Sequence, residues 1–333
     1  MAQLSNQLFA VTVLAYLTAM ICYAAEYAFG NRSLIGRAAG RPARQLVGAG
    51  APVDLPAREE PAIKREEPAF KKAPTVTKAE WAGRIAIGVN ALALLLHLGS
   101  LVTRGIAADR MPWGNMCEFI LSVTFVGSAA WLAVLSRRPG VRHLGLFVTL
   151  ALVIMLGADG MVAYTPVGPL VPALHSYWFV IHVSTIILAS GILLFGAVPA
   201  TMFLIRTGYD RGNRRFPYTL GKWVPAAAAL ERLTFRLHAF AFPLFTFGAL
   251  IAGPLWAEAS WGRYWGWDPK EVWAFISWIV YAGYLHARAT PSIKRTTATW
   301  IALLGFATML MNLFGVNLFF SGLHSYANAG GLG

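Results

Sequence analysis

Long apolar runs dominate the pattern of hydrophobic and polar positions along the chain. Each run is close to the roughly 20 residues that an α-helix needs to cross the hydrocarbon core of a bilayer. The eight runs lie at residues 7–29, 83–103, 114–136, 143–164, 176–205, 234–256, 271–289 and 297–320. Because lipid forces each spanning segment to satisfy its own backbone hydrogen bonds, we predict an all-α fold, a polytopic integral membrane helical bundle of about eight transmembrane helices.

The composition agrees with this interpretation and excludes other classes of protein. Hydrophobic residues make up 57% of the 333 residues and charged residues only 13%, whereas soluble domains carry about 25% charged residues. The chain is therefore too apolar for a water-soluble globular protein and for an intrinsically disordered one. Its two cysteines, Cys22 and Cys117, cannot make a disulfide framework or a CxxC metal site.

The first apolar run resembles a secretory signal peptide only in its position. The run is long, no Lys or Arg precedes it, and no Ala-x-Ala cleavage site closes it cleanly. We therefore expect residues 1–30 to be a retained N-terminal transmembrane anchor. Residues 31–82 are rich in proline and mixed charges, and we expect a disordered cytoplasmic linker there. This linker would tie the anchor loosely to a seven-helix membrane domain at residues 83–333.

The distribution of positive charge predicts the orientation of the helices, because cytoplasmic segments carry an excess of Lys and Arg. If the N-terminus lies outside, 24 of the 28 Lys and Arg residues fall on inner segments. The outer segments then hold only Arg104, Arg110, Arg263 and Lys270. We therefore expect both termini outside. The net charge of +13 reflects this topology, so no nucleic-acid partner is expected.

A tryptophan-rich loop joins the sixth and seventh apolar runs on the predicted outer face. Residues 256–273 contain five of the 12 tryptophans of the chain, namely Trp256, Trp261, Trp265, Trp267 and Trp273. An interfacial aromatic belt is the common interpretation of such residues, but belt residues need no glycine neighbours. Gly262 and Gly266 permit tight turns, so the indoles can form one flat surface for a planar aromatic ligand.

The end of this loop has the pattern of a helix start. Asp268 is predicted to be an N-cap, Pro269 the first helical residue and Glu271 the partner in a capping box. Direct contact with a ligand is the alternative role for Asp268. Asn115 and Glu118 are likewise expected to begin the third apolar helix, where an acidic side chain suits the helix dipole.

These motifs resemble the haem-handling proteins of cytochrome c biogenesis. The pattern W-G-x-x-W-x-W-D-P-K-E at 261–271 is similar to their tryptophan-rich (WWD) signature. Its continuation to Val272 and Trp273 resembles the CcsA/ResC branch, also named CcsB, more than the related CcmC and CcmF proteins. The resemblance runs from about residue 83 to 327 and also covers Leu96-His97, Pro112-Trp113 and the segment from Phe314 to Tyr326.

The resemblance implies which histidines bind haem iron, for which histidine is a common axial ligand. The family uses one outer-face histidine on each side of the signature, and His182 and His324 match these positions best. His175, seven residues before His182, is the rival. His286 is implied as a ligand of a separate inner haem, with its second ligand from another subunit. His97 matches a family pattern, and a hydrogen bond in the core is an equal alternative to ligation.

The tryptophans of the loop and Asp268 are implied as haem-binding residues. Haem propionates would need a cation, and the outer-face cations available are Arg104, Arg110 and Arg263. The implied cofactor is haem b, as substrate and ligand. No residue of the chain is expected to be catalytic beyond its part in positioning haem.

The implied function is that of the haem-handling subunit of a cytochrome c synthase of the system II type. Such a subunit carries haem across or through the cell (plasma) membrane and presents it, on the extracytoplasmic face, for thioether attachment to the CxxCH motif of apocytochrome c. Haem lyase activity is expected only in complex with a ResB/Ccs1-type membrane subunit. A thiol-reducing thioredoxin-like protein and membrane lipid are further expected partners. The alternatives are a haem exporter without ligase activity, a scaffold that recruits cytochrome precursors, and a transporter of another aromatic solute.

Overall fold

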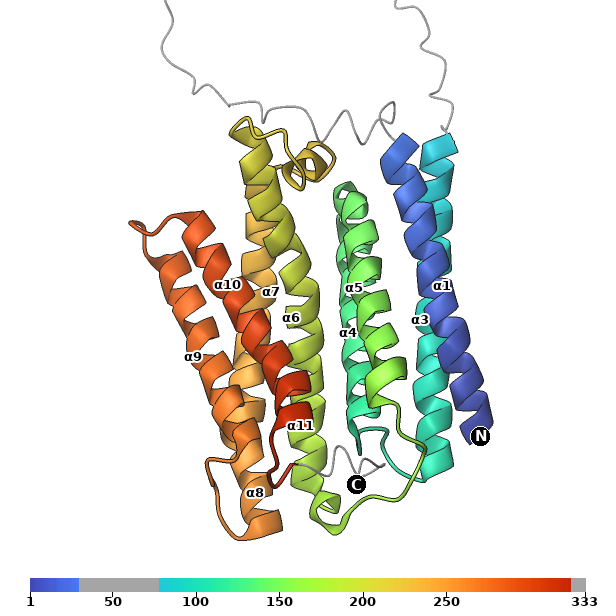
Figure 1. Ribbon diagram of the computed structural model, residues 1–333, viewed down its shortest axis with the longest axis vertical. Coiled ribbons are helices and arrows are strands. Elements are labelled where there is room, and N and C mark those ends of the chain that lie inside the picture. Colours follow the sequence, from blue (N-terminus) through green and yellow to red (C-terminus); the bar gives the residue numbers. More distant parts are fainter. Residues whose placement is uncertain (30–77, 325–333) are drawn as a thin grey trace, which may run out of the picture.

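The computed structural model describes residues 1–29 and 78–324, and this part of the chain is built from helices that stand side by side (Figure 1). The α-helices are α1 (Ala2–Phe29), α3 (Lys78–Ala108), α4 (Met116–Arg137), α5 (Gly145–Ala158), α6 (Tyr177–Asp210), α7 (Ala227–Phe247), α8 (Gly253–Trp261), α9 (Pro269–Ala289), α10 (Arg295–Leu310) and α11 (Val316–Phe319). Short 3-10 helices lie at η2 (Pro139–Leu144), η4 (Pro172–Leu174) and η5 (Tyr218–Lys222).

Within residues 1–29 and 78–324, seven continuous helices are long and apolar enough to cross a membrane. They are Ala2–Phe29, Lys78–Ala108, Met116–Arg137, Pro139–Ala163, Tyr177–Asp210, Ala227–Trp261 and Arg295–Phe319. The helix α9 stands beside them as an eighth (Figure 1), and its 21 residues rise about 31 Å, enough for the hydrocarbon core. The prediction of an all-α, polytopic membrane bundle is confirmed.

Three of the long helices contain one π-helical turn each. These turns are η3 (Asp159–Ala163) after α5, η6 (Gly248–Ala252) between α7 and α8, and η7 (Met311–Gly315) between α10 and α11. A π-turn inserts one residue into the helix and re-aims the side chains that follow, and such turns are frequent at functional sites. Both η6 and η7 border the cavity described below.

The helix α1 packs against α3 and is part of the bundle. Ser5 and Ser100 each donate a hydroxyl hydrogen bond to the other's backbone carbonyl, at 3.0 and 3.1 Å. The Tyr16 hydroxyl lies 3.3 Å from Nδ1 of His97. These buried polar contacts are costly to break in an apolar surrounding, and they fix the register of the two helices.

Most of the predicted linker lies outside the described residues, because the structure describes nothing between 30 and 77. The helix α3 begins at Lys78, ahead of the predicted start at 83. The N-terminus and α11 lie at the same end of the bundle (Figure 1), as an even number of spans requires. We call this end, which also holds the loop 262–268, the outer end.

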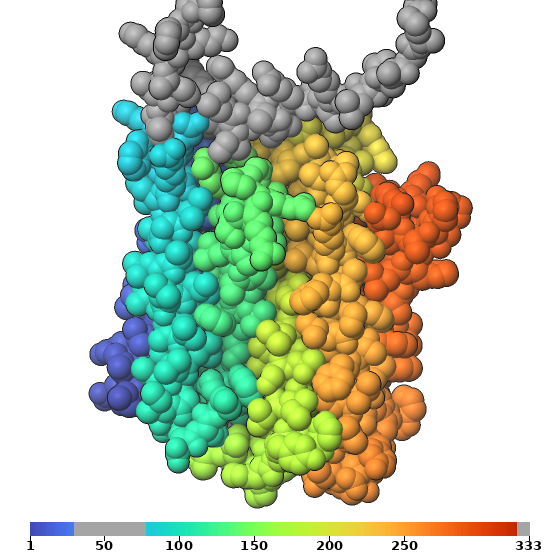
Figure 2. All heavy atoms as spheres, turned by 180° about the vertical axis from the view of Figure 1, so that it is seen from behind, coloured from blue at the N-terminus to red at the C-terminus, as the bar shows by residue number. Residues whose placement is uncertain are grey.

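The core of the bundle is the contact between α4 and α6, where glycines allow close approach. A Cβ atom on Gly191 would lie 2.7 Å from the carbonyl oxygen of Val123, and one on Gly127 would lie 3.2 Å from that of Gly191. Small residues of this kind let two membrane helices pack closely. Pairs of helices flank this core, with α1 and α3 at one edge and α9 and α10 at the other (Figures 1 and 2).

Candidate functional site

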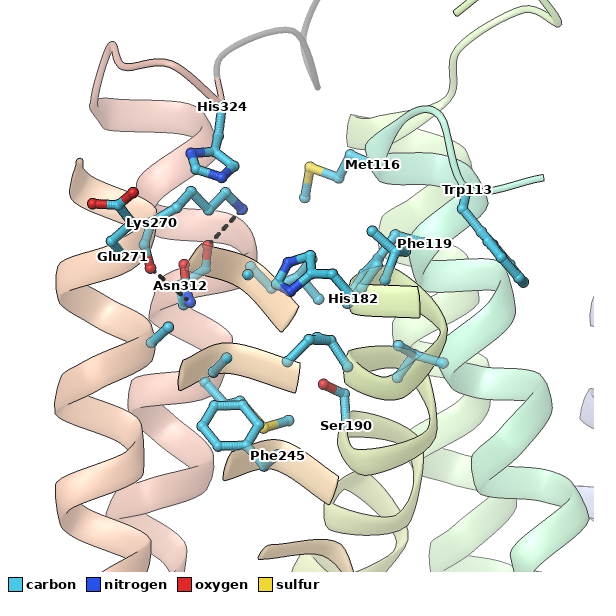
Figure 3. Close-up of a pocket in the computed structure, with 18 of the residues that line it drawn as sticks. Trp113, Met116, Phe119, His182, Ser190, Phe245, Lys270, Glu271, Asn312 and His324 are labelled. Carbon is cyan, nitrogen blue, oxygen red and sulfur yellow. Dashed lines mark hydrogen bonds between the residues drawn. The ribbon is translucent and has the colours of Figure 1, made fainter. Parts of the chain in front are cut away.

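A large apolar cavity lies towards the outer end, between α4, α6, α9 and α10. The cavity has a volume of about 210 Å³ and is open on one side. Its wall is mostly aromatic and aliphatic, with a few polar groups from α6, the tryptophan-rich loop, α9 and η7. Figure 3 shows several of these groups facing one another across the opening. Such a lining suits an apolar ligand that carries a few polar groups.

His182 enters the cavity from the second turn of α6. Its Nδ1 donates a hydrogen bond of 2.8 Å to the carbonyl oxygen of Gly248, the first residue of η6. The imidazole also stacks on the indole of Trp256, with centroids 5.4 Å apart and an interplanar angle of 23°. Gly253 makes room for the ring, because a Cβ there would lie 3.1 Å from two of its atoms. The imidazole is therefore held in one orientation.

His324 reaches the same cavity from the segment that follows α11 (Figure 3). Its Nδ1 donates a hydrogen bond of 2.7 Å to the Oδ2 atom of Asp268. Its ring meets Trp256 and Trp261 edge-on, at centroid distances of 5.4 and 5.1 Å. The backbone N–H of Leu323 donates to the other oxygen of Asp268 at 2.6 Å, so this carboxylate anchors the whole segment.

The carboxyl group of Asp268 is held in its charged form. Burial by itself would raise the pKa of Asp268, but the hydrogen bonds from His324 and Leu323 outweigh burial and bring that pKa below its ordinary value. The side chain also accepts from the backbone N–H of Lys270 and caps α9. The predicted capping role of Asp268 is present, and the contact with His324 is an additional role that the sequence pattern did not indicate.

The two histidines present the same kind of nitrogen to the cavity. A carbonyl and a carboxylate can only accept, so Nδ1 is the protonated nitrogen in each ring. The lone pair of each imidazole then resides on Nε2, which is the form that binds a metal ion, and an acceptor on Nδ1–H makes the ring a better ligand. Both rings contact the single indole of Trp256, so the structure brings these two predicted ligands together.

The tryptophans do not form the single flat surface that the sequence suggested. Trp256 and Trp261 are inclined at 56°, and Trp265 and Trp267 meet edge-on at 86°. Trp256 and Trp265 line the cavity, whereas Trp261 is not among the lining residues and packs edge-on against His324. Trp267 is 66% exposed, and the partly buried Trp273 is not among the lining residues. The reason is that each indole sits on a different element or turn, which sets its own plane.

The capping box at the start of α9 is present as predicted. Pro269 is the first helical residue, and Oε2 of Glu271 accepts from the N–H groups of Asp268 (3.0 Å) and Gly266 (2.9 Å). Gly262 ends α8 in the left-handed conformation, at φ 69°, where a residue without Cβ is favoured. The charge of Glu271 is therefore engaged in holding the loop, although this residue borders the cavity.

Sequence reasoning missed the two residues that join α9 to η7. The ammonium of Lys270 donates a 2.9 Å hydrogen bond to the carbonyl oxygen of Asn312, and the Asn312 amide donates back to the carbonyl of Lys270 at 3.4 Å. Both residues line the cavity. The charge count had placed Lys270 on the outer face, but the pairing spans 42 residues and has no local sequence signal.

Two of the cations expected to be available for propionates are engaged elsewhere. Arg104 and Arg110 both bind the buried carboxylate of Glu118, at 3.1 and 2.7 Å. Glu118 also accepts from the N–H of Gly114, so it organises the turn before α4 as well as its first turn. Asn115 is the N-cap of α4, a role that the sequence alone did not specify. The third cation, Arg263, is exposed and is not among the residues that line the cavity.

The remaining predicted ligands lie apart from the cavity. His175 is exposed after η4 and does not line it. His286 is exposed near the inner end of α9, in its last turn. His97 is fully buried between α1, α3 and α4, with its ring edge-on to Tyr16 and Phe125. Among residues 1–29 and 78–324, no group of three His, Cys, Asp or Glu side chains is placed to hold a bare metal ion.

Known proteins resemble this chain over most of its length. Residues 113–324 match the family of cytochrome c assembly proteins. The chain is 31% identical over 307 residues to the cytochrome c biogenesis protein CcsA of Gloeobacter violaceus, an alignment covering 78% of this chain and 89% of the relative. It is 34% identical over 261 residues to the CcsA protein of Guillardia theta, covering 73% of this chain and 85% of the relative.

Proposed function

The chain belongs to the cytochrome c assembly protein family, and on that premise we propose that it is the haem-handling subunit of a cytochrome c synthase. Membership of this family gives the chain a part in cytochrome c biogenesis. Its long apolar helices make it a multi-pass membrane protein. What we propose beyond them is that the outer cavity binds haem b and presents it for covalent attachment to apocytochrome c.

One observation supports this proposal more than any other. Two imidazoles from distant parts of the chain, His182 and His324, line one apolar cavity, and each has its Nδ1 anchored to a fixed acceptor. An apolar cavity with two imidazole ligands is the donor set of a six-coordinate haem. We therefore assign these two residues as axial ligands. His175 is the weaker candidate because it is exposed and apart from the cavity.

The protein's own contribution to the chemistry is positioning. In thioether formation each thiol of a CxxCH motif adds across a vinyl C=C bond, so the sulfur bonds to one carbon and the thiol hydrogen ends on the other. Cys22 and Cys117 are the only cysteines and do not form a CxxC pair, so the thiols come from the substrate. The cavity fixes the ring, excludes water and releases one axial position to the histidine of the cytochrome.

His286 is proposed as the ligand of a second, inner haem position on the path across the membrane. Its exposed side chain near the inner end of α9 can be reached by a residue of another subunit, which we propose to be a ResB/Ccs1-type membrane protein. His286→Ala should then deplete haem from the whole protein, and added imidazole should restore part of it. If the variant keeps its full haem content and fails only in transfer to the cytochrome, the inner assignment is wrong.

The proposal is tested with the protein purified together with its partner subunit. We expect the absorption spectrum of a low-spin, six-coordinate haem with two histidine ligands. Adding reduced apocytochrome c should yield a haem that stays with the polypeptide after denaturation. A complex that binds haem but never forms the thioether would be an exporter or presenter, and a complex without a haem spectrum would contradict haem handling altogether.

A further inference from the structure

Lys270 is the one lysine or arginine among the residues that line the outer cavity in the described part of the chain. It lies in the first turn of α9, and its side chain extends over the cavity wall beside His324 (Figure 3). The hydrogen bond to the carbonyl of Asn312 uses one of the three N–H groups that an ammonium carries. The cation thus faces a largely apolar wall.

The acidic residues nearest in sequence hold other hydrogen-bond partners, although the charge of Asp268 also acts on Lys270. Asp268 binds His324 and the backbone of Leu323, and Glu271 binds two N–H groups of the loop. Two arginines at the outer end, Arg104 and Arg110, share Glu118, and the third, Arg263, does not line the cavity. Lys270 is therefore the positively charged residue that can contact a ligand in the cavity.

The Lys270 side chain is partly buried, and a charge that faces an apolar wall is destabilised unless it is paired with an anion. The cargo proposed above carries two carboxylates, on the propionate side chains of haem. We infer that Lys270 binds a haem propionate and thereby fixes the rotation of the ring about the His182–Fe–His324 axis. This inference rests on the proposed function and adds to it a subsite for the carboxylate.

The subsite has a consequence for the reaction. The vinyl groups of haem b lie on the part of the ring away from the propionates. With a propionate at Lys270, the vinyl edge is turned towards the opposite wall, formed by Trp113, Met116 and Phe119 of the α4 region (Figure 3). Thiols of the cytochrome then have to reach the ring on the α4 side of the cavity.

The test uses the purified complex and two probes, haem b and haem b dimethyl ester, whose propionates carry no charge. The variant Lys270→Gln keeps an N–H donor for the Asn312 carbonyl but removes the charge, and Lys270→Arg keeps the charge. Arg263→Gln is the matched control on the same loop. We expect the wild type to bind haem at least about tenfold more tightly than the ester, as one ion pair in an apolar site allows. Lys270→Gln should lose most of this preference, because it should bind haem more weakly and the ester as well as the wild type does. Lys270→Arg and Arg263→Gln should keep the preference.

A Lys270→Gln variant that still prefers haem to the ester as strongly as the wild type would overturn the inference. So would a wild type that binds both probes equally well with normal bis-histidine spectra, because the axial ligands would then act without a carboxylate subsite. Failure of the proposed function looks different, since the wild type would then show a six-coordinate spectrum with neither probe. That outcome would overturn both proposals.

Discussion

Asp268 links the start of a helix to the orientation of an imidazole. The carboxylate caps α9, holds the N–H of Leu323 and accepts the Nδ1 proton of His324. A carboxylate on the far nitrogen of a histidine orients the ring and raises the basicity of the nitrogen that binds metal. The tryptophan-rich signature therefore acts at this position through a histidine 56 residues further along the chain.

The substitution Asp268→Asn separates these roles. Asparagine is about as good an N-cap as aspartate, so α9 should still begin normally, but the charge behind His324 is lost. We expect haem affinity to fall by roughly 10–100-fold, as for other residues that orient a metal-binding histidine. Haem titration of the purified complex measures this. Glu271→Gln, which weakens the capping box and the loop contact but leaves the His324 contact in place, is the control. An equal loss in both variants would mean that the start of α9, and not the orientation of His324, explains the effect.

The response of this contact to acid follows from the pKa of Asp268. Its hydrogen bonds hold that pKa below the ordinary value of 3.8 in spite of burial. A carboxyl whose pKa is lowered on folding stabilises the fold fully above its unfolded pKa, and this stabilisation is lost as the pH falls through the folded value. We expect the difference in thermal stability between wild type and Asp268→Asn to shrink as the pH falls below about 3.8. A difference that already declines between about pH 8 and 6 would contradict this.

Local features of these residues could be predicted from the sequence, and contacts between distant residues could not. The capping box of Asp268, Pro269 and Glu271 involves neighbours, so its spacing alone predicts it. The bond between Lys270 and Asn312 joins two helices and has no such spacing. The family resemblance brought forward His182 and His324, and the structure adds what holds each ring in place.

At the scale of the elements, π-turns shape the outer cavity. The turn η6 presents the carbonyl of Gly248 to His182, and α8 then begins at Gly253, directly against the imidazole. The hydropathy of the sequence predicted the long helices well, because it is a property of whole membrane-spanning segments. Hydropathy does not reveal the single inserted residue of a π-turn. It also does not reveal the orientation of each indole, so the expectation of one flat tryptophan surface was wrong.

Gly253→Ala tests how tightly this element fits the ligand. The new Cβ would lie 3.1 Å from Cε1 and Nδ1 of His182 and 3.3 Å from the carbonyl oxygen of Gly248. The imidazole would have to move by a few tenths of an ångström, and we expect haem affinity to fall by about tenfold while the helices stay intact. The matched control is Gly283→Ala in α9, where a Cβ would meet no atom within 4 Å. Equal haem binding by both variants would show that the fit of His182 is looser than described.

At the scale of the whole molecule, the cavity sits between two parts of the bundle that meet at α6. The helices α1, α3, α4 and α5 lie on one side of it, and α9 and α10 on the other (Figure 1). Sequence predicted the number and kind of helices. It did not predict that α1 packs along α3, because the register is set by buried contacts such as those of Ser5 with Ser100.

The orientation in the membrane is testable by labelling single cysteines. We expect Arg263→Cys, in the exposed outer loop, to react in intact cells with a thiol reagent that cannot cross the membrane. Asn213→Cys, exposed in the loop at the other end, should react only after the cells are opened. The natural Cys22 is replaced by Ser in both, and Cys117 is buried. The reverse pattern of labelling would invert the proposed topology, and with it the outer position of the cavity.

The pair of axial ligands is the central claim, and the spectrum of bound haem tests it most directly. The variants His182→Ala, His324→Ala and His175→Ala are each purified with the partner subunit, and the ligand-field bands of haem in the outer cavity are recorded. The account predicts that the first two lose the six-coordinate, low-spin spectrum and stop cytochrome maturation, while His175→Ala keeps both. Loss of that spectrum in His175→Ala, together with its retention in His182→Ala, would contradict the account.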